Sequence, residues 1–255
     1  MTAAVDIIPA KLDLGRVIRR TFEVLGRNPL LYFGLAFVFG ALPGVLTSFL
    51  YVGHATDGLA IFRSPAWYLA IVIMVFFSSF VAATTYDLAV ADHGGAPRAP
   101  REALANGLKL FLPLSAVNLL VSLAGALGSI LLLVPGLMIV TAWCVAGPAL
   151  VDERPGITQS LTRSAQLTRN NRWRVLGLFV LFFFAAIIIE AIIGALGLAS
   201  GLASGGLAAL SAPRLIGTAI INTLFTAVSL VGAAVLYAEL KELKAGAGSL
   251  SDVFD

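Results

Sequence analysis

Long apolar segments separated by short charged connections dominate this sequence and limit what it can fold into. A helix that crosses a membrane needs about 20 mostly apolar residues. Five segments reach this length: Leu30–Leu50, Ala66–Asp87, Phe111–Val134, Arg174–Ala199 and Arg214–Ala238. A sixth, shorter apolar segment, Leu137–Val151, is separated from Phe111–Val134 only by Pro135 and Gly136. These two neighbouring apolar segments therefore form either a tight hairpin or a re-entrant one that does not cross.

The composition agrees with a lipid environment. Apolar residues make up 59% of the chain and charged residues only 12%, whereas a soluble domain carries about 25% charged residues. A chain of 255 residues with so few polar side chains cannot cover a soluble surface. This excludes a soluble globular enzyme, a disordered protein and a fibrous protein. We therefore predict an all-α polytopic membrane helix bundle with six transmembrane helices.

The positions of the basic residues predict the orientation of the chain. Of its 17 Lys and Arg residues, all but Arg63 and Arg214 fall in segments that an even number of crossings places on one side. Basic residues accumulate in the loops on the cytoplasmic side of a membrane. We therefore expect both termini to be cytoplasmic, whether or not the short hairpin crosses.

Three amphipathic segments lie before or between the predicted spans, at Leu12–Arg27, Ala99–Leu110 and Ile157–Asn170. Their apolar residues recur at helical spacing, which is typical of helices that lie at a membrane interface. Each precedes a hairpin, so the sequence suggests a threefold helix–hairpin repeat, with chance similarity as the alternative. The single membrane domain divides into an interfacial helix (1–29), hairpin one (30–87), an interfacial segment (88–110), hairpin two (111–151), a further interfacial helix (152–173), hairpin three (174–238) and a cytoplasmic tail (239–255).

The basic residues of these interfacial helices are the candidate binding residues for anionic lipid headgroups. Each such residue near an anionic surface contributes about 1 kcal/mol to membrane attraction, and a neighbouring Trp is placed as an interfacial anchor. The alternative is that these residues only orient the spans. The set is Arg16, Arg19, Arg20, Arg27, Arg163, Arg169, Arg172, Trp173 and Arg174.

Glu190 is the candidate polar residue inside the membrane, because it interrupts the apolar stretch of the fifth long segment. A charged carboxylate at the bilayer centre costs about 2.5–3.5 kcal/mol on insertion scales. Glu190 therefore either takes part in a proton, cation or substrate path, or makes a packing contact with Asn118 or Asn222.

Catalytic and metal-binding motifs are scarce. The sequence has two His and one Cys and contains no nucleophile elbow, zinc-protease motif or P-loop. Asp87, Asp92 and His93 close the second predicted span, and nothing in their spacing enforces a ligand geometry, so we interpret them as a polar helix end. We expect no enzymatic activity, no cofactor, no metal and no nucleic-acid partner.

Three segments resemble the YciC-like bacterial integral membrane proteins and the related membrane domain of some glycerophosphodiester phosphodiesterases. They are LDLGRVIRRTFEVLGRNPLLYFGL (12–35), the stretch from VPGLMIV to WRVLGLFVLF (134–182) and VLYAELKE (235–242). The resemblance implies a multi-pass protein of the bacterial cytoplasmic (inner) membrane. It transfers no catalytic residue, because the chain has no polar region large enough for the phosphodiesterase domain.

Two functions remain as hypotheses. The first is a non-enzymatic scaffold, lipid-organising protein or accessory subunit, whose partners are membrane lipids with anionic headgroups and either another membrane protein or a second copy of the chain. The second is a small transporter or channel-like protein with a path near Glu190, because transporters are often built from repeats with interrupted helices. A water-filled cavity that reaches Glu190 would favour the second hypothesis.

Overall fold

The structure is a computed structural model, which describes residues 11–41, 43, 65–131, 133–204 and 212–254. Within these ranges, the side chains at 66, 131, 133, 190, 193, 196–204, 212–215 and 246–254 lie outside the description. The described residues are mostly helical and form no strand. The elements are α1 (Leu14–Arg27), α2 (Pro29–Ala36), the π-helical turn η1 (Phe37–Ala41), α4 (Pro65–His93), α5 (Pro100–Leu131), α6 (Leu133–Trp143), α7 (Ala146–Glu153), α8 (Ile157–Thr168), α9 (Arg172–Ser204) and α10 (Ala212–Phe254).

The described helices confirm the predicted all-α polytopic membrane bundle. Five segments are long and apolar enough to cross a membrane, and a sixth results if α1 and the following Pro29–Ala41 are counted as one bent span. The predicted first span, Leu30–Leu50, is described only as far as Ala41 and at Pro43. The five segments are Trp67–His93, Pro100–Ile130, Val134–Glu153, Arg172–Ile189 and Ile216–Ala245.

Helix α1 begins at a side-chain cap and ends in a sharp bend. The carboxylate of Asp13 accepts the backbone N–H of Arg16, which satisfies one of the free donors of the first turn. At the other end, Pro29 restricts Asn28 to a non-helical backbone conformation, and the next helix leaves at 96°. Of the predicted apolar face, Val17 and Leu25 are buried, whereas Phe22 is 58% exposed.

Helix α5 corrects one predicted boundary. The amphipathic segment Ala99–Leu110 is not a separate interfacial helix, because α5 continues without a break from Pro100 to Leu131. Pro113 lies inside this helix, and membrane helices tolerate proline where neighbouring groups satisfy the freed backbone. Lys109 therefore lies where α5 changes from an amphipathic to an apolar sequence, and the helix continues through this residue.

The short fourth apolar segment is a broken helix. Helices α6 and α7 belong to one candidate span and are separated at Cys144 and Val145. Pro148 explains the break, because it has no N–H to offer the carbonyl of Cys144, four residues earlier. Pro135 and Gly136, which the sequence suggested as the hairpin turn, lie within α6 instead.

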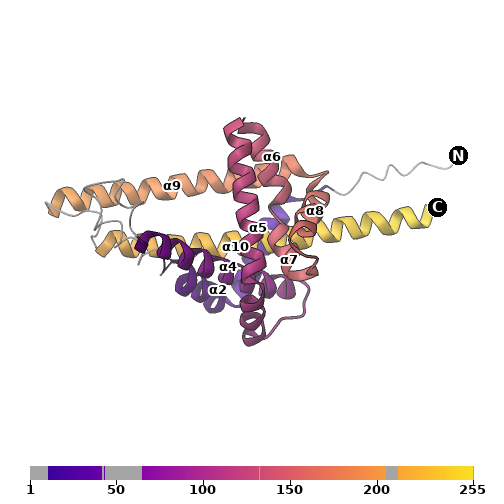
Figure 1. Cartoon of the computed structure of the whole chain (residues 1–255), viewed down its shortest axis with the longest axis horizontal. Coiled ribbons are helices and arrows are strands. Elements are labelled where there is room, and N and C mark those ends of the chain that lie inside the picture. Colours follow the sequence, from indigo (N-terminus) through magenta and orange to yellow (C-terminus); the bar gives the residue numbers. More distant parts are fainter. Residues whose placement is uncertain (1–10, 42, 44–64, 132, 205–211, 255) are drawn as a thin grey trace.

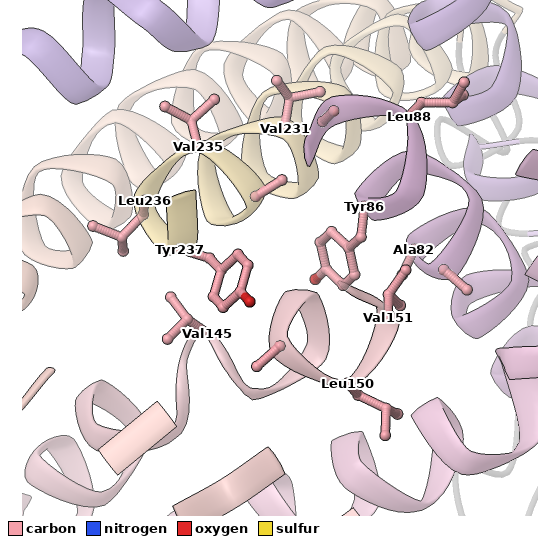
Figure 2. Packing of buried hydrophobic residues seen from close by; sticks show 14 of the residues in the cluster. Ala82, Tyr86, Leu88, Val145, Leu150, Val151, Val231, Val235, Leu236 and Tyr237 are labelled. Carbon is pink, nitrogen blue, oxygen red and sulfur yellow. The ribbon is translucent and has the colours of Figure 1, made fainter. Parts of the chain in front are cut away.

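The buried core lies where α7 meets α4 and α10. All residues from Ala146 to Val151 are buried, and Figure 2 shows Tyr86 of α4 and Tyr237 of α10 on either side of this segment. Gly147 permits the close approach, because a Cβ atom there would stand 2.8 Å from the Tyr86 ring. The α6–α7 break therefore lies within the buried core.

The long helices run in two directions. Helices α9 and α10 follow the long axis of the molecule, and α5 and α6 run across it (Figure 1). Only 6% of the apolar stretch of Arg172–Ile189 is buried, compared with 56% of that in Val134–Glu153. One flat membrane cannot be perpendicular to both pairs, so at most one of the two pairs crosses at a right angle to it.

Candidate functional site

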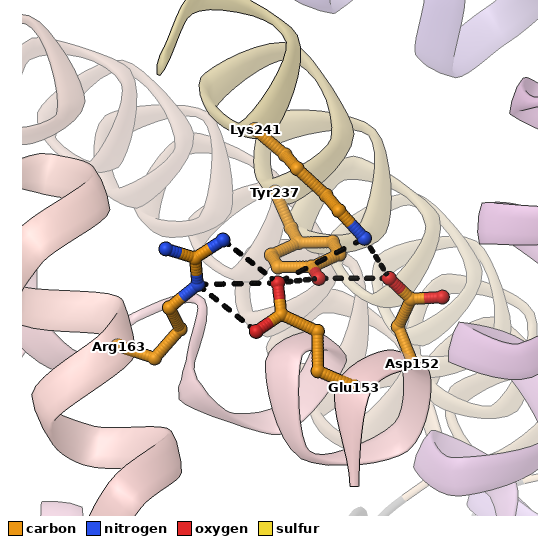
Figure 3. A network of polar contacts seen from close by, with 5 residues as sticks. All are labelled: Asp152, Glu153, Arg163, Tyr237 and Lys241. Carbon is orange, nitrogen blue, oxygen red and sulfur yellow. Dashed lines mark hydrogen bonds and ion pairs between the residues drawn. The ribbon is translucent and has the colours of Figure 1, made fainter. Parts of the chain in front are cut away.

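Charged side chains from distant parts of the chain meet in two clusters next to the core. The α7–α10 cluster consists of Asp152, Glu153, Arg163, Tyr237 and Lys241 (Figure 3). The Tyr237 hydroxyl lies 2.8 Å from a carboxylate oxygen of both Asp152 and Glu153. The Arg163 guanidinium donates to both oxygens of Glu153 at 2.9–3.1 Å, and Lys241 donates to Asp152 at 2.6 Å. Opposite charges are thus balanced within the cluster.

The α1–α4–α10 cluster consists of Arg20, His93, Glu239 and Glu242. The Nη1 atom of Arg20 lies 2.6 Å from Oε1 of Glu239, 3.1 Å from Nε2 of His93 and 3.6 Å from Oε2 of Glu242. Nε2 of His93 also lies 3.2 Å from Oε1 of Glu242. A shallow polar pocket over this cluster is lined by Arg20, Glu23, Val24, Arg27, His93 and Glu242.

Asp87 and Asp92, which the sequence placed together with His93, each have their own partners. The Asp92 carboxylate accepts the hydroxyl of Tyr32 at 2.6 Å. Arg98 pairs with the Asp87 carboxylate, which also accepts the Asn106 amide at 3.0 Å. The three residues therefore form no joint ligand set, and His93 instead lies with two glutamates of α10.

The predicted lipid-facing arginines divide into two groups. Arg20 and Arg163 take part in the two clusters, Arg27 donates to the Asp92 carbonyl at 2.5 Å, and Arg174 donates to the Leu12 carbonyl. The others that face outward are Arg16, Arg19, Arg169 and Trp173, of which Trp173 is 72% exposed. Arg172 is half-buried, and its Nε atom has no hydrogen-bond partner.

The sequence analysis did not single out the other residues of the two clusters. Asp152, Glu153, Tyr237 and Glu239 stand at the ends of predicted spans, where charged residues are ordinary. The signal that could have identified them is that acidic and basic span ends were predicted on one side of the membrane. Charges of opposite sign there can pair.

A half-open apolar groove of about 280 Å³ lies between α1, α9 and α10. Its three polar side chains donate to nearby backbone carbonyls: Thr21 to that of Val17, Ser229 to that of Thr226, and Cys144 to that of Thr141 at the end of α6. The groove therefore offers apolar contacts. Its lining includes Ile18 and Phe22 of α1, Leu178 and Phe182 of α9, and Val228 and Ala233 of α10.

The predicted polar path inside the membrane is only partly described. Asn118 is exposed on α5 and Asn222 is half-buried on α10, and no hydrogen bond joins these two described residues. Glu190 belongs to α9, and its side chain lies outside the description. Its role as a relay or as a packing contact therefore stays a prediction.

Comparison of the chain with protein-family models, with curated proteins and with solved structures finds no match. The resemblance to YciC-like membrane proteins therefore stays a prediction.

Proposed function

We propose that this protein is a non-enzymatic membrane scaffold that holds the acyl chain of a bilayer phospholipid in the groove between α1, α9 and α10. The observation that carries the proposal is the lining of the groove. Apolar side chains from three helices surround it, and its few polar groups already donate to nearby backbone carbonyls. Such a surface gains most from an apolar ligand, because nothing in it requires a hydrogen bond from the ligand.

The surroundings of the groove also support a phospholipid. Only 6% of the apolar α9 stretch beside it is buried, which suits a helix that faces lipid chains. Arg16 and Arg19 flank the groove residues Val17 and Ile18 on α1, and Arg19 pairs with Glu23 of the same helix at 3.4 Å. Basic residues at this level attract anionic headgroups, while the acyl chain occupies the groove.

The charged clusters support a structural role. In both clusters, carboxylates face cations from other helices, so their evident effect is to hold α1, α4, α7, α8 and α10 together. We further propose that both termini are cytoplasmic and that the membrane is a bacterial inner membrane, as the basic residues and the YciC-like segments suggest. Either another membrane protein or a second copy of the chain completes the scaffold.

Blocking the groove tests the proposal. The Ala233→Trp substitution places a large side chain in the groove lining, so we expect the purified protein to retain about tenfold less phospholipid, equivalent to ~1.4 kcal/mol of binding free energy. Native mass spectrometry of the protein released from detergent measures the retained lipid. Ala126→Trp is the matched control, because Ala126 is exposed on α5, away from the groove. Equal lipid retention by the two variants would refute the groove as the binding site.

A further inference from the structure

We propose that His93, Glu239 and Glu242 bind a divalent transition-metal ion, in competition with the guanidinium of Arg20. Each of the three residues offers one ligand atom, and the three atoms lie within 4.8 Å of one another. His93 is the last residue of α4, and Glu239 and Glu242 are three residues apart on one face of α10. The proposal is independent of the lipid groove.

Hydrogen bonding within the cluster is incomplete when Arg20 is the only cation. Glu239 is 3% exposed, and its Oε1 atom has no aligned hydrogen bond although Nη1 of Arg20 is 2.6 Å away. Nε2 of His93 faces a donor, Arg20, at 3.1 Å and an acceptor, Glu242, at 3.2 Å. A neutral imidazole nitrogen cannot accept from the first and donate to the second. A metal ion removes both conflicts, because all three residues then present lone pairs to one centre.

The charge of the cluster also favours a divalent cation. With a neutral imidazole, two carboxylates and one guanidinium leave one net negative charge. Replacing the guanidinium with an ion of charge +2 neutralises the ligand set. The Arg20 side chain is 35% exposed and the Glu242 side chain is 61% exposed, so Arg20 can swing into solvent and the ion can enter from the polar pocket.

The ligand types indicate the kind of ion. One imidazole nitrogen with two carboxylate oxygens matches the donors that Zn²⁺ accepts, whereas Mg²⁺ and Ca²⁺ prefer oxygen ligands alone. A bound Zn²⁺ would join the end of α4 to α10 and release the contact that Arg20 makes from α1.

Zn²⁺ titration of the full chain tests the site. The protein is purified in detergent, stripped with a chelator and titrated with ZnCl₂ by calorimetry. We expect one ion per chain in the wild type. Glu242→Gln removes a ligand and should weaken the affinity by about tenfold or more, whereas Arg20→Gln removes the competing cation and should strengthen it by about tenfold.

These opposite effects separate a metal site from a purely structural cluster. Arg163→Gln in the α7–α10 cluster is the matched control, for which the affinity should stay at the wild-type value. Thermal unfolding without metal checks that each variant is folded. Glu242 is largely exposed, so its variant alone decides the question if Arg20→Gln does not fold. Wild-type Zn²⁺ affinity in Glu242→Gln, or no Zn²⁺ binding by the wild type, overturns the proposal.

Discussion

Ser164 completes the hydrogen bonding at the break between α6 and α7. Its hydroxyl accepts the backbone N–H of Val145 at 3.2 Å and donates to the carbonyl of Ala142 at 2.8 Å. The Val145 N–H would otherwise be free, because the helical ladder stops at the break, whereas the Ala142 carbonyl also accepts the Thr168 hydroxyl at 3.3 Å. The side chain comes from α8 and is fully buried. Helix α8 therefore supplies hydrogen bonds to the backbone at the α6–α7 break.

Removing this hydroxyl should destabilise the protein. In Ser164→Ala, the buried Val145 N–H loses its partner, which costs about 1–3 kcal/mol of the free energy of unfolding. Unfolding in mixed detergent and SDS micelles measures the change. Thr162→Ala is the control, because Thr162 is exposed on the same helix and bonds only within it. If Thr162→Ala lowered the free energy of unfolding as much as Ser164→Ala, the hydroxyls would stabilise only α8 itself and not the α6–α7 break.

Neighbouring residues show what the sequence could and could not predict at this scale. Arg19 and Arg20 have the same chemistry and were predicted to play the same role, yet Arg19 is exposed and Arg20 is held by Glu239. Likewise, the buried face of α8 contains Ser160, Ser164 and Thr168, which helical periodicity of apolar residues does not reveal. The basic and amphipathic character was predictable, whereas the partners were not, because they come from segments far along the chain.

At the scale of elements, glycine brings α5 and α6 together. A Cβ atom on Gly136 would stand 2.6 Å from the backbone nitrogen of Ser129 and 2.8 Å from its Cα atom. Backbone atoms cannot move aside as the end of a flexible side chain can. The Pro135–Gly136 pair therefore marks the correct hairpin, but its glycine acts as a contact surface between helices and not as a turn.

Adding one methyl group at this contact should separate the two helices. We expect Gly136→Ala to lower the free energy of unfolding by about 1–3 kcal/mol through overpacking. Gly34→Ala serves as the control, since nothing lies within 4 Å of the added Cβ there, and alanine in a helix is up to about 1 kcal/mol more favourable than glycine. Thermal unfolding in detergent compares the two variants. Unchanged stability in Gly136→Ala would mean that α5 and α6 do not pack as described.

Helix identity was predictable from the sequence, but helix boundaries were less so. Apolar length located the segments that became α4, α5, α9 and α10, because a membrane span has a fixed minimum length. The predicted helix boundary at Leu110 was wrong, because a charged residue such as Lys109 changes the environment of a helix without breaking its backbone hydrogen bonds. The break near Cys144 was not foreseen, although Pro148 is its sequence signal.

At the scale of the whole molecule, α9 packs against α6 and α10, but only 6% of its apolar stretch Arg172–Ile189 is buried. It contacts α10 through Phe182 and Phe225, whose ring centroids are 4.4 Å apart, and α1 covers the space between them nearer the charged clusters. The apolar groove results from this incomplete packing. Sequence patterns could predict that α9 is apolar, but not that its neighbours leave a gap beside it, since that depends on how all the helices are arranged.

Photocrosslinking with a phospholipid that carries a diazirine at the end of an acyl chain tests the central claim most directly. The full chain is reconstituted in vesicles that contain this lipid, irradiated, digested and mapped by mass spectrometry. An occupied groove predicts adducts concentrated on its lining, including Leu178, Val228 and Ala233, and a loss of these adducts in Ala233→Trp. Labelling of the exposed α5 residues Leu119 and Leu123 that equals labelling of the groove would contradict the account.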